Sequence, residues 1–128
     1  MHVSRHDLAV KIDAPGAHAR HQGGFGSAAT DDVAAEYFTM AAGADLAPLL
    51  EGLEHDSCHS AHWGYVVAGA VVVTYRDGAD ERCAAGDMFY WPPGHSVRVE
   101  ADAELAMFSP RAEHGAVIDH IAAKMADA

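Results

Sequence analysis

The 128-residue sequence has few basic residues and lacks any long apolar segment. Eight Lys and Arg residues stand against 19 Asp and Glu residues, which gives a formal net charge of −11 with histidines neutral. A chain of this charge repels phosphate backbones and anionic headgroups, so we expect neither nucleic acid nor a membrane as a partner. No apolar run approaches the ~18 to 20 residues of a transmembrane helix. Because no hydrophobic signal segment follows the first residues, we expect a cytoplasmic protein.

Cysteine is also scarce, whereas histidine is abundant. Cys58 and Cys83 can form at most one disulfide, and without a secretion signal each is more plausible as a buried thiol or a metal ligand. Ten histidines in a chain of this length are a compositional hint of metal chemistry. Half of the residues are hydrophobic, which supports one folded domain over residues 1–128.

Turn signals divide most of the chain into short strand candidates. We expect residues 1–30 to form an irregular arm, with one edge strand around residues 8–12. Strand-forming stretches follow at the ranges 37–40, 63–67, 70–75, 81–84, 88–91, 97–100 and 104–108. Asp77-Gly78 predicts a hairpin turn, and apolar residues at helical spacing predict a helix over 116–127. The sequence therefore predicts an all-β, antiparallel sandwich or barrel with a short C-terminal helix.

Two segments carry a recognisable pattern: CHSAHWGYVVAG at residues 58–69 and GDMFYWPPGH at residues 86–95. Together they resemble the two motifs of the cupin superfamily, over residues 33–110. The resemblance implies a jelly-roll barrel with a pocket at one mouth that usually holds a divalent metal. It also implies pairing into a homodimer through outer strands and the N-terminal arm.

The motifs depart from the family pattern at the metal-binding positions. His62 stands where the family places a glutamate, and Val97 stands where it places the last histidine. His95 follows Gly94 directly, and the paired-histidine positions fall in the segment 55–58. A metal site must therefore be argued from the residues that are present.

Those residues predict a site formed by Cys58, His62 and His95. A thiolate and two imidazoles leave one tetrahedral position open, and this donor set favours zinc, with iron or copper next. His55 or His59 is an alternative to Cys58, because the loop register is uncertain from sequence. The alternative roles are a buried hydrophobic thiol for Cys58 and, for the histidines, core packing or a backbone hydrogen bond.

The remaining histidines and the aromatic residues have simpler interpretations. We expect surface positions for six histidines: His2, His6, His18, His21, His114 and His120. We expect four aromatic residues to pack inside the barrel: Trp63, Tyr65, Tyr90 and Trp91.

Two functions from different classes fit these observations. The first is a metal-dependent cupin enzyme of oxygenase, isomerase, lyase or decarboxylase type that acts on a small polar molecule. The second is a non-catalytic cupin that binds or senses a small molecule without a functional metal centre. The departures from the motif reduce the case for standard oxygenase or oxalate chemistry.

Overall fold

The computed structural model describes residues 1–29 and 31–127. It contains eight strands, three short 3-10 helices and one α-helix, α1 (Arg111–Ala126). The strands are β1 (Val10–Ala14), β2 (Ala17–Gln22), β3 (Ser27–Ala28), β4 (Asp31–Met40), β5 (His62–Thr74), β6 (Asp80–Ala84), β7 (Met88–Trp91) and β8 (Ser96–Pro110). The 3-10 helices are η1 (Arg5–Asp7), η2 (Ala47–Leu50) and η3 (Glu54–Asp56).

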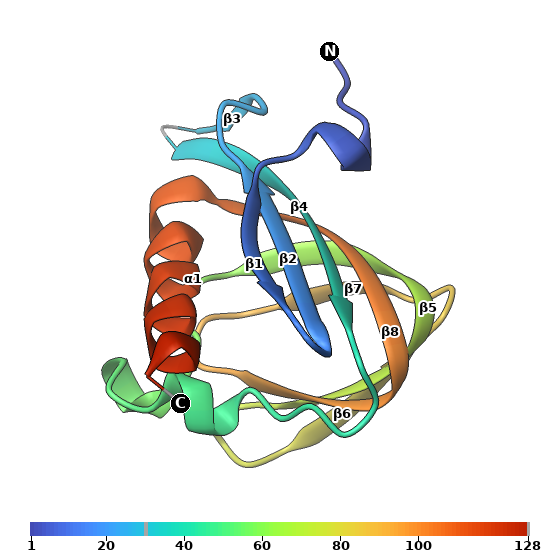
Figure 1. Cartoon of the computed structure of the whole chain (residues 1–128), viewed down its shortest axis with the longest axis vertical. Helices are drawn as coiled ribbons and strands as arrows, with labels where there is room; N and C mark the ends of the chain where they lie inside the picture. The colour runs from blue at the N-terminus through green and yellow to red at the C-terminus, as the bar shows by residue number, and fades with distance from the viewer. Residues whose placement is uncertain (30, 128) are drawn as a thin grey trace.

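All strand pairings are antiparallel, in a strongly curved sheet of order β1-β2-β4-β8-β5-β6. β3 adds to β4, and β7 adds to β5. Figure 1 shows the sheet wrapping around the interior, with α1 standing along one side. This arrangement confirms the predicted all-β antiparallel barrel with a C-terminal helix.

The hairpin at Asp77-Gly78 is confirmed. β5 pairs with β6 from Ala70↔Ala84 to Thr74↔Asp80, and the turn lies between them. Gly78 has a φ of 88°, a left-handed value that glycine adopts without steric cost. The Asp77 carboxylate accepts a hydrogen bond from the backbone N–H of Ala79 at 2.9 Å.

Two pairs of predicted strands are single long strands in the structure. The stretch 63–67 and all but the last residue of the stretch 70–75 belong to β5, and the stretches 97–100 and 104–108 belong to β8. Gly69, which resembles a terminator in the sequence, lies at a register shift inside β5 with a φ of 77°. The irregularity bends the strand without ending its pairing, as a β-bulge does.

The N-terminal region is more regular than the sequence predicts. β1 is the expected edge strand, but it is followed by a second strand, β2, which pairs along its whole length with residues 35–40 of β4. The inward-facing positions of β2 are Ala19 and His21, which are too small or too polar to give a clear hydrophobic alternation. The expectation of an irregular arm over residues 1–30 is therefore wrong for β2.

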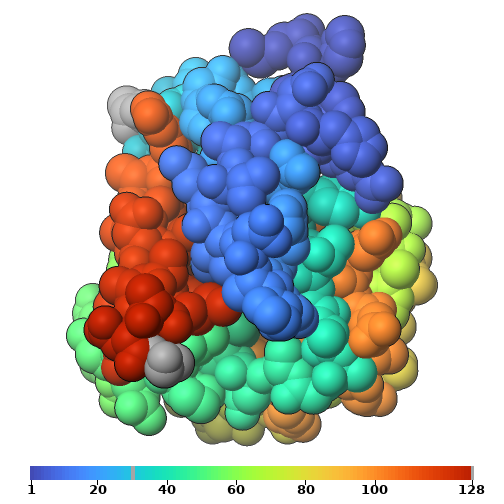
Figure 2. Space-filling model, in the orientation of Figure 1, coloured from blue at the N-terminus to red at the C-terminus, as the bar shows by residue number. Residues whose placement is uncertain are grey.

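Helix α1 begins five residues earlier than predicted, directly after Pro110, and packs against η2, β1, β4 and β8. Its residues Val117, Ile118 and Ile121 are buried, and Met125 packs beside them, as expected. Figure 2 shows α1 lying beside the β1–β2 hairpin on the same face. No helix among residues 1–29 and 31–127 is long and apolar enough to cross a membrane.

The barrel interior is a cluster of 12 buried residues drawn mainly from β5, β7 and β8. Of the four aromatic residues expected inside the barrel, Trp91 is buried. Trp63, Tyr65 and Tyr90 are half-exposed on the outer face, so the prediction is wrong for these three. In a strand, successive side chains alternate between faces, and here the register assigns these three to the outside.

Candidate metal centre

The structure brings the three predicted site residues together. Cys58 lies in the loop before β5, His62 is the first residue of β5, and His95 lies in the turn between β7 and β8. A backbone bridge joins two of them: Cys58 N–H donates to the His95 carbonyl at 2.8 Å. Their potential ligand atoms all lie within 4.8 Å of one another, and all three side chains are buried.

The tautomer of His95 follows from its hydrogen bond. Its Nδ1 lies 2.7 Å from the carbonyl oxygen of Pro92. A carbonyl oxygen only accepts, so Nδ1 carries the proton and Nε2 carries a free lone pair. Burial lowers the pKa of His95 to about 4, which keeps the ring neutral at pH 7.

The tautomer of His62 is fixed by a longer chain of hydrogen bonds. Ser109 Oγ donates to a carboxylate oxygen of Glu36, so it can accept from His62 Nδ1 at 2.7 Å. His62 Nε2 is then the unprotonated nitrogen, and it lies 3.3 Å from Cys58 Sγ. Burial, with a smaller effect of the neighbouring histidines, lowers the pKa of His62 well below its ordinary value.

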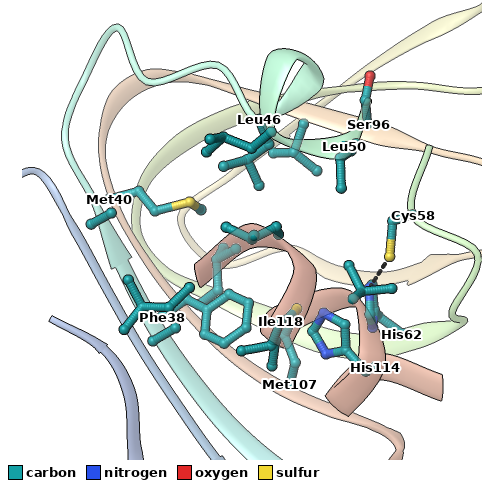
Figure 3. A pocket seen from close by; sticks show the side chains of 18 of the residues that line it. Phe38, Met40, Leu46, Leu50, Cys58, His62, Ser96, Met107, His114 and Ile118 are labelled. Carbon is teal, nitrogen blue, oxygen red and sulfur yellow. Dashed lines mark hydrogen bonds between the residues drawn. The ribbon is translucent and has the colours of Figure 1, made fainter. Parts of the chain in front are cut away.

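The separation of Cys58 Sγ and His62 Nε2 suits a tetrahedral metal site. With zinc–nitrogen and zinc–sulfur bonds of about 2.05 and 2.3 Å, a sulfur and a nitrogen ligand of a tetrahedral zinc ion are about 3.6 Å apart. The separation of 3.3 Å between Cys58 Sγ and His62 Nε2 needs little adjustment to reach that value. Figure 3 shows these two side chains pointing toward each other.

Cys58 is a thiol in the metal-free protein. Burial raises its pKa to about 12. A thiol of this pKa is a weak nucleophile and becomes a strong ligand only when it loses its proton. Binding of a metal at this site must therefore displace one proton from sulfur.

A second buried cluster, formed by His21, Glu36 and His114, supports the first. Glu36 accepts hydrogen bonds from Nδ1 of His21 at 2.7 Å and from Nδ1 of His114. Burial alone would raise the pKa of Glu36, but the charge of His114 and the three hydrogen bonds lower it to about 2. The centre of the protein therefore holds a carboxylate anion, linked to His62 through Ser109.

Sequence reasoning missed this cluster. His21 and His114 were expected at the surface, and that expectation is wrong, because their exposed fractions are 6% and 3%. The available signal was Glu36, a charged residue inside the apolar stretch that forms β4. A charge in such a position requires buried partners.

His55 and His59 do not replace Cys58. The side chain of His55 is half-exposed and accepts a hydrogen bond from Arg76 at 2.6 Å. His59 is partly exposed and lies outside the group whose ligand atoms converge. The structure thus places Cys58, and neither His55 nor His59, in the group that contains His62 and His95.

A cavity of about 70 Å³ lies next to the site. Because one water molecule needs about 15 Å³ of such volume, the cavity has room for roughly five water molecules. Its walls are mainly apolar and include Phe38, Met40, Leu46, Leu50, Met107 and Ile118, with Cys58, His62 and His114 at one side. His95 also lines the cavity. Helix α1 supplies part of the wall, so the helix and the barrel together enclose the site.

Comparison with known proteins identifies a matching family and several structures of similar fold. The family model of the cupin domain matches residues 36–114. A single-residue variant of Bacillus subtilis oxalate decarboxylase matches with a TM-score of 0.61 and 22% identity, over 85% of this chain and 29% of that chain. A formate complex of the Lactobacillus farciminis oxalate decarboxylase matches with a TM-score of 0.60 and 21% identity, over 85% of this chain and 32% of that chain.

A further B. subtilis oxalate decarboxylase, with Mn(II) centres, gives a TM-score of 0.60 at 20% identity, over 85% of this chain and 29% of that one. The chain thus spans about a third or less of these neighbours, and identities this low show the fold alone. No curated protein matches the chain. Because the family model covers more than half of the sequence, the chain belongs to the cupin family.

Proposed function

We propose that this protein binds one divalent metal ion through Cys58 Sγ, His62 Nε2 and His95 Nε2. The observation that carries the proposal is the pair of hydrogen bonds at the far nitrogens of the two histidines. Each fixes the tautomer that leaves the Nε2 lone pair available for the metal. Such outer partners orient the ligands of metal sites in proteins.

The second cluster is better suited to supporting this site than to holding a metal itself. One oxygen of Glu36 already accepts from both His21 and His114, and the other accepts from Ser109. A metal there would have to displace these hydrogen bonds. By contrast, the converging nitrogens of His62 and His95 have no carboxylate or carbonyl partner of their own.

The donor set favours zinc, with iron or copper next. A thiolate with two imidazoles is a typical set for zinc, and oxygen-preferring ions such as Mn(II) and Mg²⁺ are disfavoured by the sulfur. Three protein ligands leave one position for water or a small molecule. A divalent cation held in this way polarises the oxygen of a bound ligand.

We propose that the ligand is a small molecule whose polar group faces the histidines and whose remainder contacts the apolar wall. The volume of about 70 Å³ restricts it to a few non-hydrogen atoms unless α1 moves. Oxalate itself fits poorly. Among the described residues that line the cavity none is Arg or Lys, so the second carboxylate would meet no guanidinium or ammonium group.

His114 is the residue best placed to carry a proton if the protein is an enzyme. The centroids of the His114 and His62 rings are 4.1 Å apart, and His114 borders the cavity. Nδ1 of His114 donates a hydrogen bond to Glu36. A carboxylate-oriented imidazole is a common general acid or base. The mainly apolar cavity also suits the second function, non-catalytic binding or sensing of a small molecule.

Elemental analysis of protein purified without a metal-affinity column tests the proposal. We expect about one equivalent of a transition metal, most often zinc. Substitution with Co(II) should give thiolate-to-cobalt charge-transfer absorption, which reports on Cys58 directly. Protein that contains no metal and fails to bind added Zn²⁺ or Co²⁺ would leave only the non-metal binding function. Turnover of a candidate ligand by the loaded protein distinguishes an enzyme from a sensor.

A further inference from the structure

A second pocket opens to the surface between helix α1 and the β1–β2 hairpin, two elements that lie side by side in Figures 1 and 2. Its volume of about 480 Å³ is within the range of small-molecule sites. We call it the hairpin pocket. The ionisable residues among its described lining are Lys11 on β1, His21 on β2, and Arg111 and Asp119 on α1.

The ring of His21 forms part of the wall of the hairpin pocket, although only 6% of the residue is exposed. Its Nδ1 donates to Glu36, which is ionised above its pKa of about 2 and can only accept. In the neutral ring, Nε2 therefore carries a lone pair. Among residues 1–29 and 31–127, none hydrogen-bonds to this nitrogen. A buried polar atom in this state needs a partner from water or from a ligand.

Gly115 leaves this nitrogen open to the hairpin pocket. Gly115 also lines the pocket, and a Cβ at this position would lie 3.5 Å from His21 Nε2. It is the fifth of the 16 residues of α1, an interior position where glycine is less favourable than alanine. The missing side chain leaves room beside His21 Nε2 for an atom of a ligand.

Hydrogen-bond donors line the same pocket. Arg111 lies across the backbone of Gly23, where a Cβ would be 2.2 Å from the arginine Nε. Its Nη1 pairs with Asp32 at 3.3 Å, and no described residue accepts a hydrogen bond from its Nε or Nη2. Pro110, the residue before α1, supplies no side-chain cap, so the first N–H groups of the helix are also available.

The charges around the hairpin pocket favour a monoanion. Lys11 and Arg111 supply two positive charges in a protein whose net charge is −11. Asp119 also lines the pocket, and the carboxylate of Glu36 lies behind the His21 ring. A dianion such as phosphate would be repelled by both carboxylates. A single carboxylate is attracted by the two cations with about half of that repulsion.

We propose that the hairpin pocket binds a small carboxylate that also carries a hydroxyl group. The carboxylate oxygens accept hydrogen bonds from Arg111, from Lys11 and from the free N–H groups at the start of α1. The hydroxyl group donates to His21 Nε2, in the space that Gly115 leaves. A ligand with only one of the two groups would leave either the cations or the imidazole nitrogen without a partner.

Amide chemical shifts of the ¹⁵N-labelled protein, titrated with lactate at constant ionic strength, test the proposal. We expect saturable shifts at Gly23, Ala112 and Gly115, with a dissociation constant of about 1 mM or below for a ligand of this size. Propionate is nearly the same molecule without the hydroxyl group. It should bind severalfold more weakly, because His21 Nε2 would lose its partner. Chloride at the same ionic strength should give no saturable shift.

Three variants locate the site within the protein. Arg111→Gln should raise the dissociation constant of lactate at least about tenfold, because charge-assisted hydrogen bonds are lost. Gly115→Ala should raise it severalfold by filling the space beside His21, yet should raise the melting temperature, since alanine is the better helix former. Lys124→Gln is the control, because it removes a cation from the last turn of the same helix. It should leave the affinity unchanged.

Two results with the wild-type protein would overturn the proposal. One is the absence of saturable shifts in the hairpin pocket, including the case in which lactate shifts only the amides around the metal centre. The other is equal affinity for lactate and propionate, which would contradict the assigned role of His21 Nε2.

Unchanged lactate affinity in both Arg111→Gln and Gly115→Ala would overturn the proposal as well. None of these results bears on the metal proposal. Cys58, His62 and His95 are not among the described residues that line the hairpin pocket.

Discussion

His62 Nδ1 lies 2.7 Å from Ser109 Oγ, and this contact ties a residue at the start of β5 to one near the end of β8. Ser109 in turn donates to Glu36 on β4. The chain of donors leads from the proposed metal ligand to a buried carboxylate. The orientation of His62 is thus set by three strands that are distant in the sequence.

Replacement of Cys58 by Ser should remove most of the metal affinity. Serine conserves the size of the side chain but supplies a poor ligand, so the loss should exceed the ~10–100-fold cost of losing an outer partner. Competition with a chromophoric chelator measures the change. Cys83→Ser is the matched control, because Cys83 is also buried but lies on β6 away from both histidines. Equal losses in the two variants would contradict the proposed ligand set.

Ser109→Ala should weaken metal binding by about 10–100-fold without removing a ligand. The change leaves His62 Nδ1 without its acceptor, so the ring is free to adopt the wrong tautomer. The same chelator competition provides the measurement. Ser60→Ala serves as control, because Ser60 is fully buried near the site but its hydroxyl bonds only to the Ala61 carbonyl. Unchanged affinity in Ser109→Ala would show that the relay does not position His62.

Metal binding should release close to one proton at neutral pH. Cys58 has a pKa of about 12 and must lose its proton, whereas His95, with a pKa of about 4, is already neutral. The apparent affinity should therefore rise about tenfold for each pH unit near neutrality. Calorimetry in buffers of different ionisation enthalpy measures the released proton. Cys58→Ser should release none, and release by that variant would point to another ligand.

Acid should destabilise the protein through Glu36. Its pKa is about 2 in the folded protein against 4.5 ordinarily, so the folded state prefers the anion. This contribution, on the order of 3 kcal/mol at 1.36 kcal/mol per pKa unit, is complete above pH 4.5 and is lost as the pH falls toward 2. Urea unfolding as a function of pH measures it.

Glu36→Gln is the control variant for the loss of stability at low pH. The amide cannot titrate. The free energy of unfolding of the variant should therefore be lower than that of the wild type at neutral pH, and should fall less steeply between pH 4.5 and 2. His21 and His114, the two residues that donate to Glu36, remain present in both proteins. Parallel pH profiles for the two proteins would show that the carboxylate is not the group that titrates.

Gly69→Ala should destabilise the fold much more than Gly78→Ala. Both glycines have positive φ, which costs an L-residue about 1–2 kcal/mol. A Cβ at Gly69 would also lie 2.0 Å from the carbonyl oxygen of Asp102, whereas one at Gly78 would meet no atom within 4 Å. The overpacking adds about 1–3 kcal/mol at Gly69 alone. Thermal denaturation of the two variants measures the difference, and equal losses would contradict the close approach of β5 and β8.

The sequence by itself determined the fold class and named Cys58, His62 and His95 as the candidate site, with His55 and His59 as alternatives to Cys58. Asp77-Gly78 fixes a hairpin because its backbone preference is local, and the Pro-Pro-Gly bend brings His95 next to Cys58 through a backbone bridge. The two turn signals each act over a few residues, and the family resemblance supplies the order of the strands. Whether a metal occupies the site remains a prediction.

Only the tertiary structure decided which polar and aromatic residues face inward. Glu36 and His114 are 78 positions apart, and no local sequence pattern shows that the two lie side by side. They become buried because β2, β4, β8 and α1 enclose them together and satisfy their hydrogen bonds. Trp63 and Tyr90 show the converse, since their side chains are apolar but the strand register turns them outward. Burial depends on contacts between distant segments, and composition and local periodicity do not specify those contacts.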